Sequence, residues 1–322
     1  HAVSVTGVAD ATPATHAWVV DLTPPDTTIT EAPAALDNSV DVSLAFEADE
    51  DATFTCAVDG GAAAPCTSPL ALTGLADGPH SVVITATDLA GNVEVEPARH
   101  DWVLDSAAPD TVIDSGPTGL VTTATATFTF SSPDAGPGAT FACSLDGAAF
   151  AACASPRAYS GLAEGDHTFA VRVTDATGNV DPTPAQRSWT VDTVAPTVTL
   201  GANPSLTSDR RPTLVFTTAG GPTQYFCRIN TTASGAFTAC TSATGHQPAS
   251  NLADGAYVLS VYVQDAAGNQ STTVSHSFSI DATAPTVTLG ANPSLFNQRR
   301  PTFGFTTAGG PTQYFCRINT TA

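Results

Sequence analysis

A repeat of just under ninety residues runs through the chain and limits its fold more than any other feature. Closely similar stretches begin at Pro25, Pro109, Pro196 and Pro285, so successive starts lie 84, 87 and 89 residues apart. Each complete copy contains two Cys, then Leu-Ala-Asp/Glu-Gly, then Asp-x-x-Gly-Asn, and finally an aromatic residue three positions before an Asp. We therefore predict the end of one repeat at 1–24, repeat one at 25–108, repeat two at 109–195, repeat three at 196–284 and the beginning of repeat four at 285–322.

Repeats three and four are nearly identical where they overlap. Residues 282–322 match residues 193–233 at 34 of 41 positions. A catalytic domain is seldom multiplied in this way, whereas an array gains length or binding sites with each added unit. The duplication therefore favours a spacer or a multivalent binder over an enzyme.

The composition of the 322 residues indicates a folded, acidic protein. Hydrophobic residues make up 42% and charged residues 12%, which is too apolar for a disordered acidic tail. The formal net charge of −20 argues against a nucleic-acid partner, because phosphates are neutralised by clustered Lys and Arg. There is no run of about 18 apolar residues, so we expect no membrane insertion in this segment.

Apolar residues within each repeat recur at every second position, which is typical of β-strands. Clusters of Gly, Pro, Asp and Asn separate these runs at intervals that indicate an antiparallel sandwich. The residues expected to face the core are Val40, Val42, Leu44 and Phe46; Ala124, Ala126, Phe128 and Phe130; Val82, Ile84 and Ala86; Phe169, Val171 and Val173; Leu259, Val261 and Val263; and Trp102, Trp189 and Phe278.

A resemblance is carried by Leu75-Ala-Asp77-Gly78, by its equivalents at 162–165 and 252–255, and by the Asp-x-x-Gly-Asn that follows each. This pattern resembles the bacterial immunoglobulin-like (fibronectin type III-like) tandem repeats of large secreted surface, adhesin or fibre proteins. It extends over essentially the whole chain. The resemblance implies an all-β fold of tandem Ig-like β-sandwich domains arranged end to end. Two of the three copies have His80 and His167 where the corner before strand F usually has Tyr, and the third has Tyr257.

The cysteines occur as one pair in each complete repeat. The predicted disulfides join Cys56 to Cys66, Cys143 to Cys153 and Cys227 to Cys240, while Cys316 aligns with Cys227, and its partner would fall at position 329. Zinc is the competing interpretation, but Cys-x-x-Cys pairs are missing and two Cys per repeat cannot supply four ligands. Disulfides require an oxidising compartment, so we expect an extracellular or cell-surface location.

The repeated acidic residues have two interpretations. The Asp-x-x-Gly-Asn element fits a hairpin turn, in which Asp bonds the backbone ahead of it and Gly supplies a positive φ. Calcium is the alternative. At the ends of repeats, calcium ligands would come from Asp105, Asp110, Asp192 and Asp281, against the simpler interpretation of solvated linker carboxylates. No other cofactor is expected.

An aromatic residue and an Arg recur on the predicted outer face of repeats three and four. Phe226 and Arg228, and again Phe315 and Arg317, alternate with the inward-facing residues of the Cys strand. Such residues dominate interface hot spots, so they are candidates for lateral contact with another copy. The alternative is that a neighbouring loop covers Phe226.

No catalytic motif accompanies the repeats. The sequence contains no Gly-x-Ser-x-Gly, no phosphate loop and no His-Glu-x-x-His, and most His positions follow the repeat. We therefore expect a non-enzymatic structural segment of a long extracellular fibre or adhesin stalk. Its partners would be other copies or repeats of the same protein, or a cell-surface target. The alternatives are multivalent modules that bind a glycan or protein, or accessory repeats of a secreted hydrolase.

Overall fold

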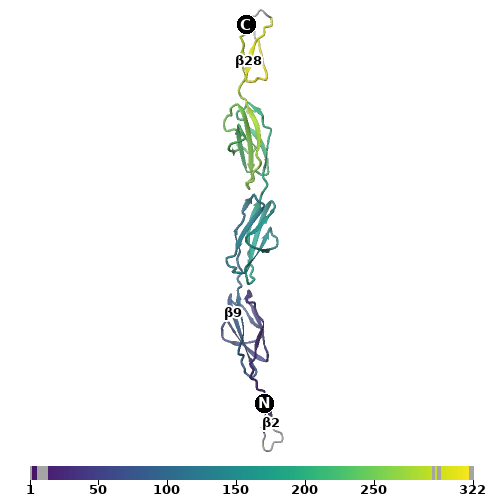
Figure 1. Cartoon of the computed structure of the whole chain (residues 1–322), viewed down its shortest axis with the longest axis vertical. Coiled ribbons are helices and arrows are strands. Elements are labelled where there is room, and N and C mark those ends of the chain that lie inside the picture. Colours follow the sequence, from purple (N-terminus) through teal and green to yellow (C-terminus); the bar gives the residue numbers. More distant parts are fainter. Residues whose placement is uncertain (1, 6–13, 292–293, 296–298, 319–322) are drawn as a thin grey trace. The chain divides into compact units, whose positions relative to one another are not determined.

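The computed structural model describes residues 2–5, 14–291, 294–295 and 299–318, and every regular element in these residues is a β-strand (Figure 1). The chain divides into two compact units. The first comprises residues 1–118, 125–160 and 166–189, and the second comprises residues 119–124, 161–165 and 190–322. Among the described residues, no helix has the length and apolar character needed to cross a membrane.

Repeat one lies in the first unit and consists of two sheets. The three-stranded sheet has the order β3 (Thr27–Glu31), β5 (Val42–Ala48), β8 (Leu70–Leu72). The five-stranded sheet has the order β4 (Leu36–Asp37), β10 (Ala98–Leu104), β9 (Gly78–Asp88), β6 (Ala52–Val58), β7 (Ala64–Cys66). The short β4 pairs in parallel with the end of β10. The first unit also contains the hairpin of β1 (Ala2–Val5) and β2 (Ala14–Ala17).

Repeat two has the same strand order. Its three-stranded sheet is β11 (Val112–Ser115), β13 (Thr125–Ser131), β16 (Arg157–Ser160). Its five-stranded sheet is β12 (Gly119–Val121), β18 (Ala185–Val191), β17 (Gly165–Thr174), β14 (Thr140–Leu145), β15 (Ala151–Cys153).

Repeat three lies in the second unit and again has this order. The sheets are β19 (Thr197–Leu200), β21 (Leu214–Ala219), β24 (Gly245–His246), and β20 (Leu206–Thr207), β26 (Val274–Ile280), β25 (Gly255–Gln264), β22 (Gln224–Asn230), β23 (Thr238–Ala239). In repeat four, β27 (Thr286–Leu289) pairs with β28 (Phe305–Ala308).

The predicted alternation places the core between the two sheets of each complete repeat. Leu44, Ile84 and Trp102 are buried in repeat one, and Phe128 stacks on Phe169 in repeat two with ring centroids 4.0 Å apart. Burying a large apolar side chain contributes about 1.5–3 kcal/mol, so these strands are held chiefly by their inward faces.

Two of the expected core residues lie outside the fully buried set. The expectation for Val40 is wrong: it precedes β5 and is 39% exposed, because the strand that buries its alternate residues begins only at Val42. Ala124, its counterpart in repeat two, is half-buried for the same reason, since β13 begins at Thr125.

A buried carboxylate fastens the N-terminal part of the sandwich to the rest in repeats one and two. In repeat one the Glu94 carboxylate accepts hydrogen bonds from Thr27 N at 2.7 Å, Thr27 Oγ1 at 2.9 Å and Ala86 N at 2.9 Å. In repeat two Asp181, which is 1% exposed, accepts bonds from Thr111 Oγ1 at 2.6 Å and Thr183 N at 2.8 Å. Donors surround these carboxylates, which is the condition under which a charge can be buried.

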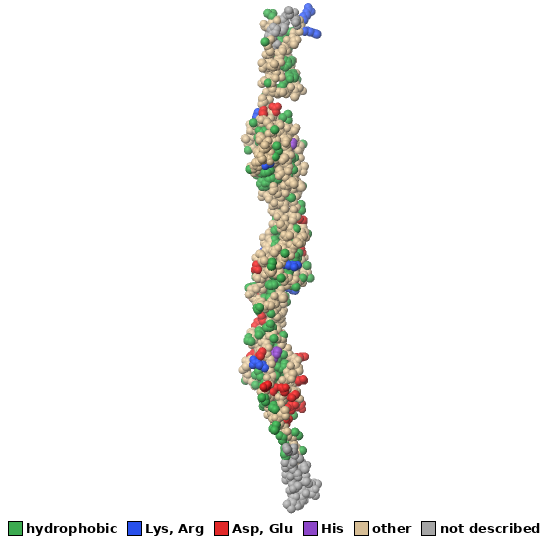
Figure 2. All heavy atoms as spheres, in the orientation of Figure 1, with side chains coloured by type: hydrophobic (Ala, Val, Ile, Leu, Met, Phe, Trp, Pro, Cys, Tyr) green, Lys and Arg blue, Asp and Glu red, His purple; other side chains and the backbone are tan. Residues whose placement is uncertain are grey.

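Acidic side chains are unevenly distributed among the repeats. Repeat one contains 15 Asp and Glu against one Arg, whereas repeat three contains four against three Arg. Figure 2 shows acidic side chains gathered on the surface of the repeat near the N-terminal end. Such a surface repels anionic polymers and favours solubility.

Candidate functional site

The residues that recur most regularly converge on the short linkers that join one repeat to the next. Each Asp-x-x-Gly-Asn element forms a turn in which the Asp carboxylate holds the backbone. Asp175 Oδ1 accepts bonds from Thr177 N, Gly178 N and Asn179 N at 2.8–2.9 Å, and Gly178 has a φ of +97°. Burial alone would raise the pKa of Asp175, but these donors and the Asn179 amide hold it below its ordinary value. The turn prediction therefore accounts for the Asp and the Gly.

The Asn of this turn also makes a contact that the turn does not require. Its side-chain amide bonds the main chain of the linker that precedes its own repeat. Asn179 Nδ2 donates to the main-chain carbonyl of Asp105 at 2.7 Å, and Asn269 Nδ2 donates to that of Asp192 at 2.7 Å. In repeat one, Asn92 Nδ2 is 3.2 Å from the Asp21 carbonyl oxygen. The same amide also bonds the Asp of its turn, at 2.9 Å for Asn179 and 3.0 Å for Asn269, so its orientation is fixed.

The acidic residue of Leu-Ala-Asp/Glu-Gly holds the linker that follows its own repeat. Asp77 Oδ1 accepts bonds from both N and Oγ of Ser106 at 2.8 Å. Glu164 accepts a bond from Thr193 N at 2.9 Å and another from its hydroxyl. Asp254 does the same with Ala282 N, at 3.2 Å, and the Thr283 hydroxyl.

Electrostatics are consistent with these contacts. Hydrogen bonds from Ser106 lower the pKa of Asp77, and hydrogen bonds from Thr193 lower that of Glu164. The Thr283 hydroxyl and the Ala282 amide lower the pKa of Asp254. Each carboxylate is therefore ionised when it holds the linker. The linkers after repeats one and two receive both contacts, one from the repeat before the linker and one from the repeat after it. The linker after repeat three receives the Asp254 contact, and the linker before repeat one receives the Asn92 contact. These contacts are called the linker clamp below.

The four predicted calcium ligands are not brought together. Asp105 Oδ1 and Asp192 Oδ1 accept bonds from the linker amides two residues on, Ala107 N at 3.1 Å and Val194 N at 3.3 Å. Asp110 N donates to the Asp134 carboxylate, and Asp281 N donates to the Thr207 carbonyl. The carboxylates of Asp105 and Asp192 therefore each cap a turn in the linker. Calcium at these four positions stays a prediction.

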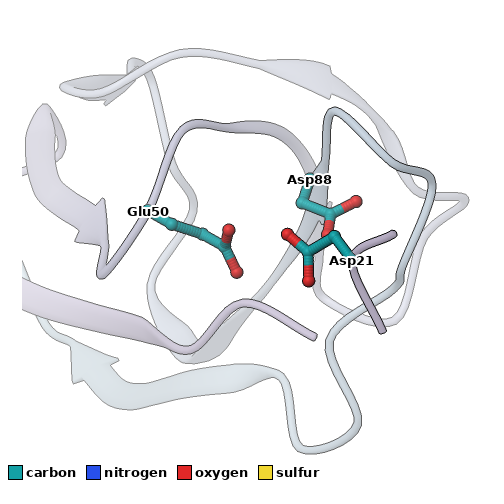
Figure 3. Close-up of side chains that lie close together, drawn as sticks. All are labelled: Asp21, Glu50 and Asp88. Carbon is teal, nitrogen blue, oxygen red and sulfur yellow. The ribbon is translucent and has the colours of Figure 1, made fainter. Parts of the chain in front are cut away.

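A different acidic group does meet in the part of the chain that the structure describes. Ligand atoms of Asp21, Glu50 and Asp88 all lie within 4.8 Å of one another (Figure 3). Burial, followed by the charges of Asp21, Asp88 and other nearby carboxylates, raises the pKa of Glu50. Carboxylate oxygens at this spacing suit a hard divalent cation, although exposed acidic groups are also common without one.

Three disulfides occur at the predicted pairs, each at one edge of a five-stranded sheet. Cys56–Cys66 and Cys143–Cys153 each span 10 residues, and Cys227–Cys240 spans 13. In the part of the chain that the structure describes, Cys316 is free and exposed.

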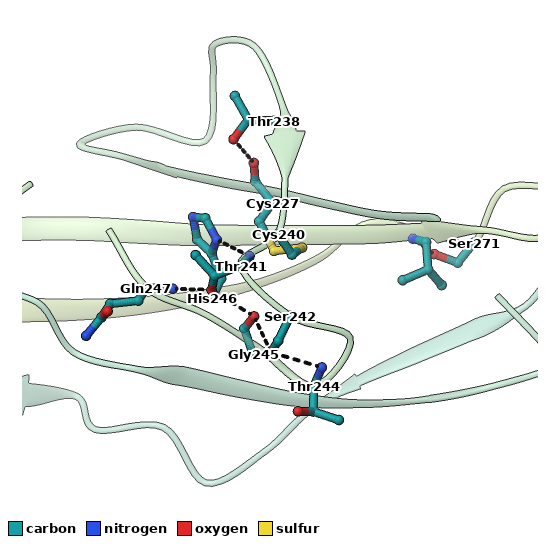
Figure 4. Close-up of a disulfide and its surroundings, with 11 residues drawn as sticks. Cys227, Thr238, Cys240, Thr241, Ser242, Thr244, Gly245, His246, Gln247 and Ser271 are labelled. Atoms are coloured by element: carbon teal, nitrogen blue, oxygen red, sulfur yellow. Dashed lines mark hydrogen bonds between the residues drawn. A yellow bond between two sulfur atoms is a disulfide. The ribbon is translucent and has the colours of Figure 1, made fainter. Parts of the chain in front are cut away.

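In repeat three, hydrogen bonds within residues 241–247 fix the segment that follows the disulfide (Figure 4). Thr241 N donates to His246 Nδ1 at 3.3 Å, and Gln247 N donates to Thr241 Oγ1 at 3.0 Å. Burial lowers the pKa of His246, which is 9% exposed. This histidine is therefore neutral near pH 7 and serves as an acceptor within the fold.

The predicted lateral pair of repeat three is engaged within its own repeat. Phe226 is half-buried and stacks on Tyr262 with centroids 4.7 Å apart. Arg228 donates to the carbonyls of Gly235 and Ala233 at 2.7 and 2.8 Å and lies over Phe237. Phe315 and Arg317, the equivalents in repeat four, are exposed. A role of these four residues in lateral contact stays a prediction.

The sequence predicts the turns and the cysteines but not the linker contacts. In the sequence, the Asn of Asp-x-x-Gly-Asn is explained by its turn alone, and the acidic residue before Gly78, Gly165 or Gly255 belongs only to a motif. A signal is present, because both recur at the period of the repeat while their neighbours vary. Nothing in the local pattern indicates that they bond residues 29 and 74 positions away.

Comparisons with known proteins agree with this architecture. The model of the bacterial Ig-like domain family matches residues 200–282. None of the curated proteins matches the chain.

Three solved structures are similar to the chain at low sequence identity. The fibronectin(III)-like modules of Clostridium thermocellum CbhA share 15% identity over 52% of this chain and 94% of theirs, with a TM-score of 0.35. A 1.5-MDa bacterial ice-binding adhesin shares 15% over 81% of this chain and 98% of that chain, with a TM-score of 0.40. A tetra-tandem repeat from the extending region of a large adhesion protein shares 22% over 83% and 76%, with a TM-score of 0.32.

The TM-scores of these three structures are low, so they carry no argument about this chain. The family match is more specific, because it falls on one complete repeat, whose landmarks and strand order recur in the other two. Residues 200–282 therefore match the bacterial Ig-like domain family, and repeats one and two share the landmarks and the strand order of that segment.

Proposed function

We propose that the chain is a structural segment of an extracellular fibre or adhesin stalk, in which disulfide-bonded Ig-like repeats act as spacers. The repeats would begin at Pro25, Pro109, Pro196 and Pro285 and be arranged end to end. In this proposal the chain has no catalytic role. Its partners would be other copies of the same protein or a target on a cell surface.

The linker clamp is the observation that carries this proposal. A spacer becomes longer with each added repeat only if consecutive repeats cannot fold back on one another. A flexible joint needs no specific contacts, whereas here side chains at repeat-encoded positions bond the linker backbone from both sides. The second linker is also short, and it ends at the buried Pro196, whose ring limits φ.

The disulfides support the extracellular part of the proposal. A bond that closes a loop of this size stabilises a fold by roughly 3 kcal/mol and persists only in an oxidising compartment. Each complete repeat has one, at the same edge of its sheet. A domain with its own covalent bond can remain folded under load when its neighbours are disturbed.

Small-angle X-ray scattering of the full chain tests the clamp. We expect the double variant Asn179→Ala, Asn269→Ala to sample a broader range of conformations than the wild type, with a smaller mean radius of gyration and unchanged circular dichroism. The matched control is Asn203→Ala, because Asn203 bonds Val215 within repeat three rather than a linker. A wild type as flexible as the double variant would refute the proposed spacer.

A further inference from the structure

The corner where the chain enters β9, the longest strand of repeat one, includes His80, the third residue of that strand, which faces two acceptors. His80 Nδ1 lies 2.9 Å from Asp59 Oδ2, and His80 Nε2 lies 2.7 Å from the Ala76 carbonyl oxygen. The imidazole also packs against Trp102, with ring centroids 5.4 Å apart, and its side chain is only 10% exposed. Both ring nitrogens of His80 therefore lie within hydrogen-bond distance of an oxygen atom.

A neutral imidazole has one N–H, so it could donate to only one of these oxygens and would turn a lone pair toward the other. The imidazolium form donates to both. Asp59 is positioned for this contact: it lies at a φ of +50°, its Oδ1 accepts a bond from Ser81 N at 2.8 Å, and its Oδ2 faces the ring. We propose that His80 is held as an imidazolium ion in the folded chain, which makes the stability of this corner of repeat one depend on pH.

The other charges near the ring do not oppose this state. Arg99 and Asp101 on β10 line the same shallow pocket as His80, but the Arg99 guanidinium and the Asp101 carboxylate form an ion pair with each other at 2.7 Å. His100 stacks on Trp102 and bonds the Pro33 carbonyl through Nε2, and Asp77 is occupied by Ser106. The carboxylate of Asp59 is the charge that contacts the ring, and its sign favours the cation.

The direction of the pH effect follows from the pair. Hydrogen bonds to the Ala76 carbonyl and to Asp59 raise the pKa of His80 above its ordinary 6.5, and the Ser81 amide and His80 lower the pKa of Asp59 below 3.8. The His80 contribution to stability is complete below pH 6.5 and is lost as the pH rises through its folded pKa. The Asp59 contribution is complete above pH 3.8, so the corner is firmest between these values.

The other repeats provide an internal comparison. In repeat two, His167 Nδ1 lies 2.8 Å from Asp146 Oδ2, and the ring stacks on Trp189. In repeat three, Tyr257 occupies the position, donates to the Ala253 carbonyl at 3.1 Å and stacks on Phe278. The contact between a histidine ring and an Asp carboxylate is therefore shared by repeats one and two, whereas repeat three has a phenol at this position.

Ring NMR of the full chain tests the inference. We expect the ¹H–¹³C signal of His80, assigned by its disappearance in His80→Tyr, to titrate with a midpoint above 6.5 and to move to a lower midpoint in Asp59→Asn. The Tyr variant should fold, because repeat three already contains Tyr at this corner. A wild-type midpoint at or below 6.5, or one that Asp59→Asn leaves unchanged, would overturn the proposal.

Hydrogen exchange provides a second readout on the same samples. After correction for the intrinsic rate, protection of β9 should fall as the pH rises above 6.5 in the wild type but not in His80→Tyr, while protection of β25 should stay constant in both. Equal loss from β9 and β25 would show that the pH effect does not originate at this histidine.

Discussion

Among single residues, Glu94 in repeat one has a buried carboxylate that depends on hydrogen bonds from its neighbours. It is 6% exposed and accepts three hydrogen bonds, two from Thr27 and one from Ala86. We expect Glu94→Ala to lower the free energy of unfolding of repeat one by about 2–3 kcal/mol, because the buried amides of both residues lose their acceptor.

The measurement is chemical denaturation followed by Trp102 fluorescence, with Trp18 and Trp189 replaced by Phe. Glu96, two residues further on, is exposed, so Glu96→Ala is the matched control and should change stability by less than about 0.5 kcal/mol. Equal effects of the two variants would contradict the assigned role of Glu94.

Among the described residues, Glu50 has acidic neighbours instead of hydrogen-bond donors, so its charge destabilises the fold. Its pKa is raised, so protonation is easier in the folded state and stability falls as the pH rises through that pKa. We expect Glu50→Gln to raise the melting temperature of repeat one at about pH 7 and low salt, with a smaller gain at high salt or below the pKa of Glu50. A lower melting temperature of the variant under the first condition would contradict repulsion among Asp21, Glu50 and Asp88.

Residue identity alone could predict the core and the cysteines but not these polar contacts. Leu44, Phe128 and Val261 follow from alternation, since one face of a strand must be buried. The partners of Glu94 and His80 could not be predicted, because each lies across the sandwich or across a turn at a separation that the local pattern does not encode.

Among the elements, the short edge strands are tied by disulfides to the strands beside them. We expect the double variant Cys56→Ala, Cys66→Ala to lose about 3 kcal/mol of stability in repeat one only. The measurement is hydrogen exchange resolved by repeat. Cys316→Ser is the control, because Cys316 is free and exposed, and it should leave repeats one to three unchanged. Destabilisation that spread equally to repeat three would show that the repeats do not unfold independently.

The linkers between repeats should respond to pH. The pKa values of Asp77, Glu164 and Asp254 are lowered by linker donors, so the contribution of the clamp is present above the ordinary pKa values of 3.8 and 4.5 and is lost as the pH falls through the lower folded values. We expect scattering from the full chain to indicate looser joints near about pH 3 than at about pH 6, before circular dichroism changes. Joints that loosen only when the strands unfold would argue against this assignment.

The strands themselves are largely predictable from the sequence, whereas the joints are not. A period of two, with Gly and Pro between the runs, is a local signal for β-strands, and the residues expected inside are buried or half-buried, apart from Val40. The Asn92, Asn179 and Asn269 side chains each serve two elements at once, and only the turn could be inferred from a five-residue motif.

As a whole molecule, the chain contains three complete repeats that each have their own core and their own disulfide. We expect such a chain to lengthen under force in steps. The disulfide withholds the residues between its cysteines from extension. A separation of 10 residues corresponds to about 35 Å of contour, and one of 13 to about 45 Å, at roughly 3.5 Å per residue.

Single-molecule force spectroscopy of the full chain decides whether the repeats are independent modules. We expect separate unfolding events for repeats one, two and three. After reduction, two of these events should lengthen by about 35 Å and one by about 45 Å. One concerted event, or steps whose lengths do not change with reduction, would contradict a spacer made of independently folded, disulfide-closed repeats.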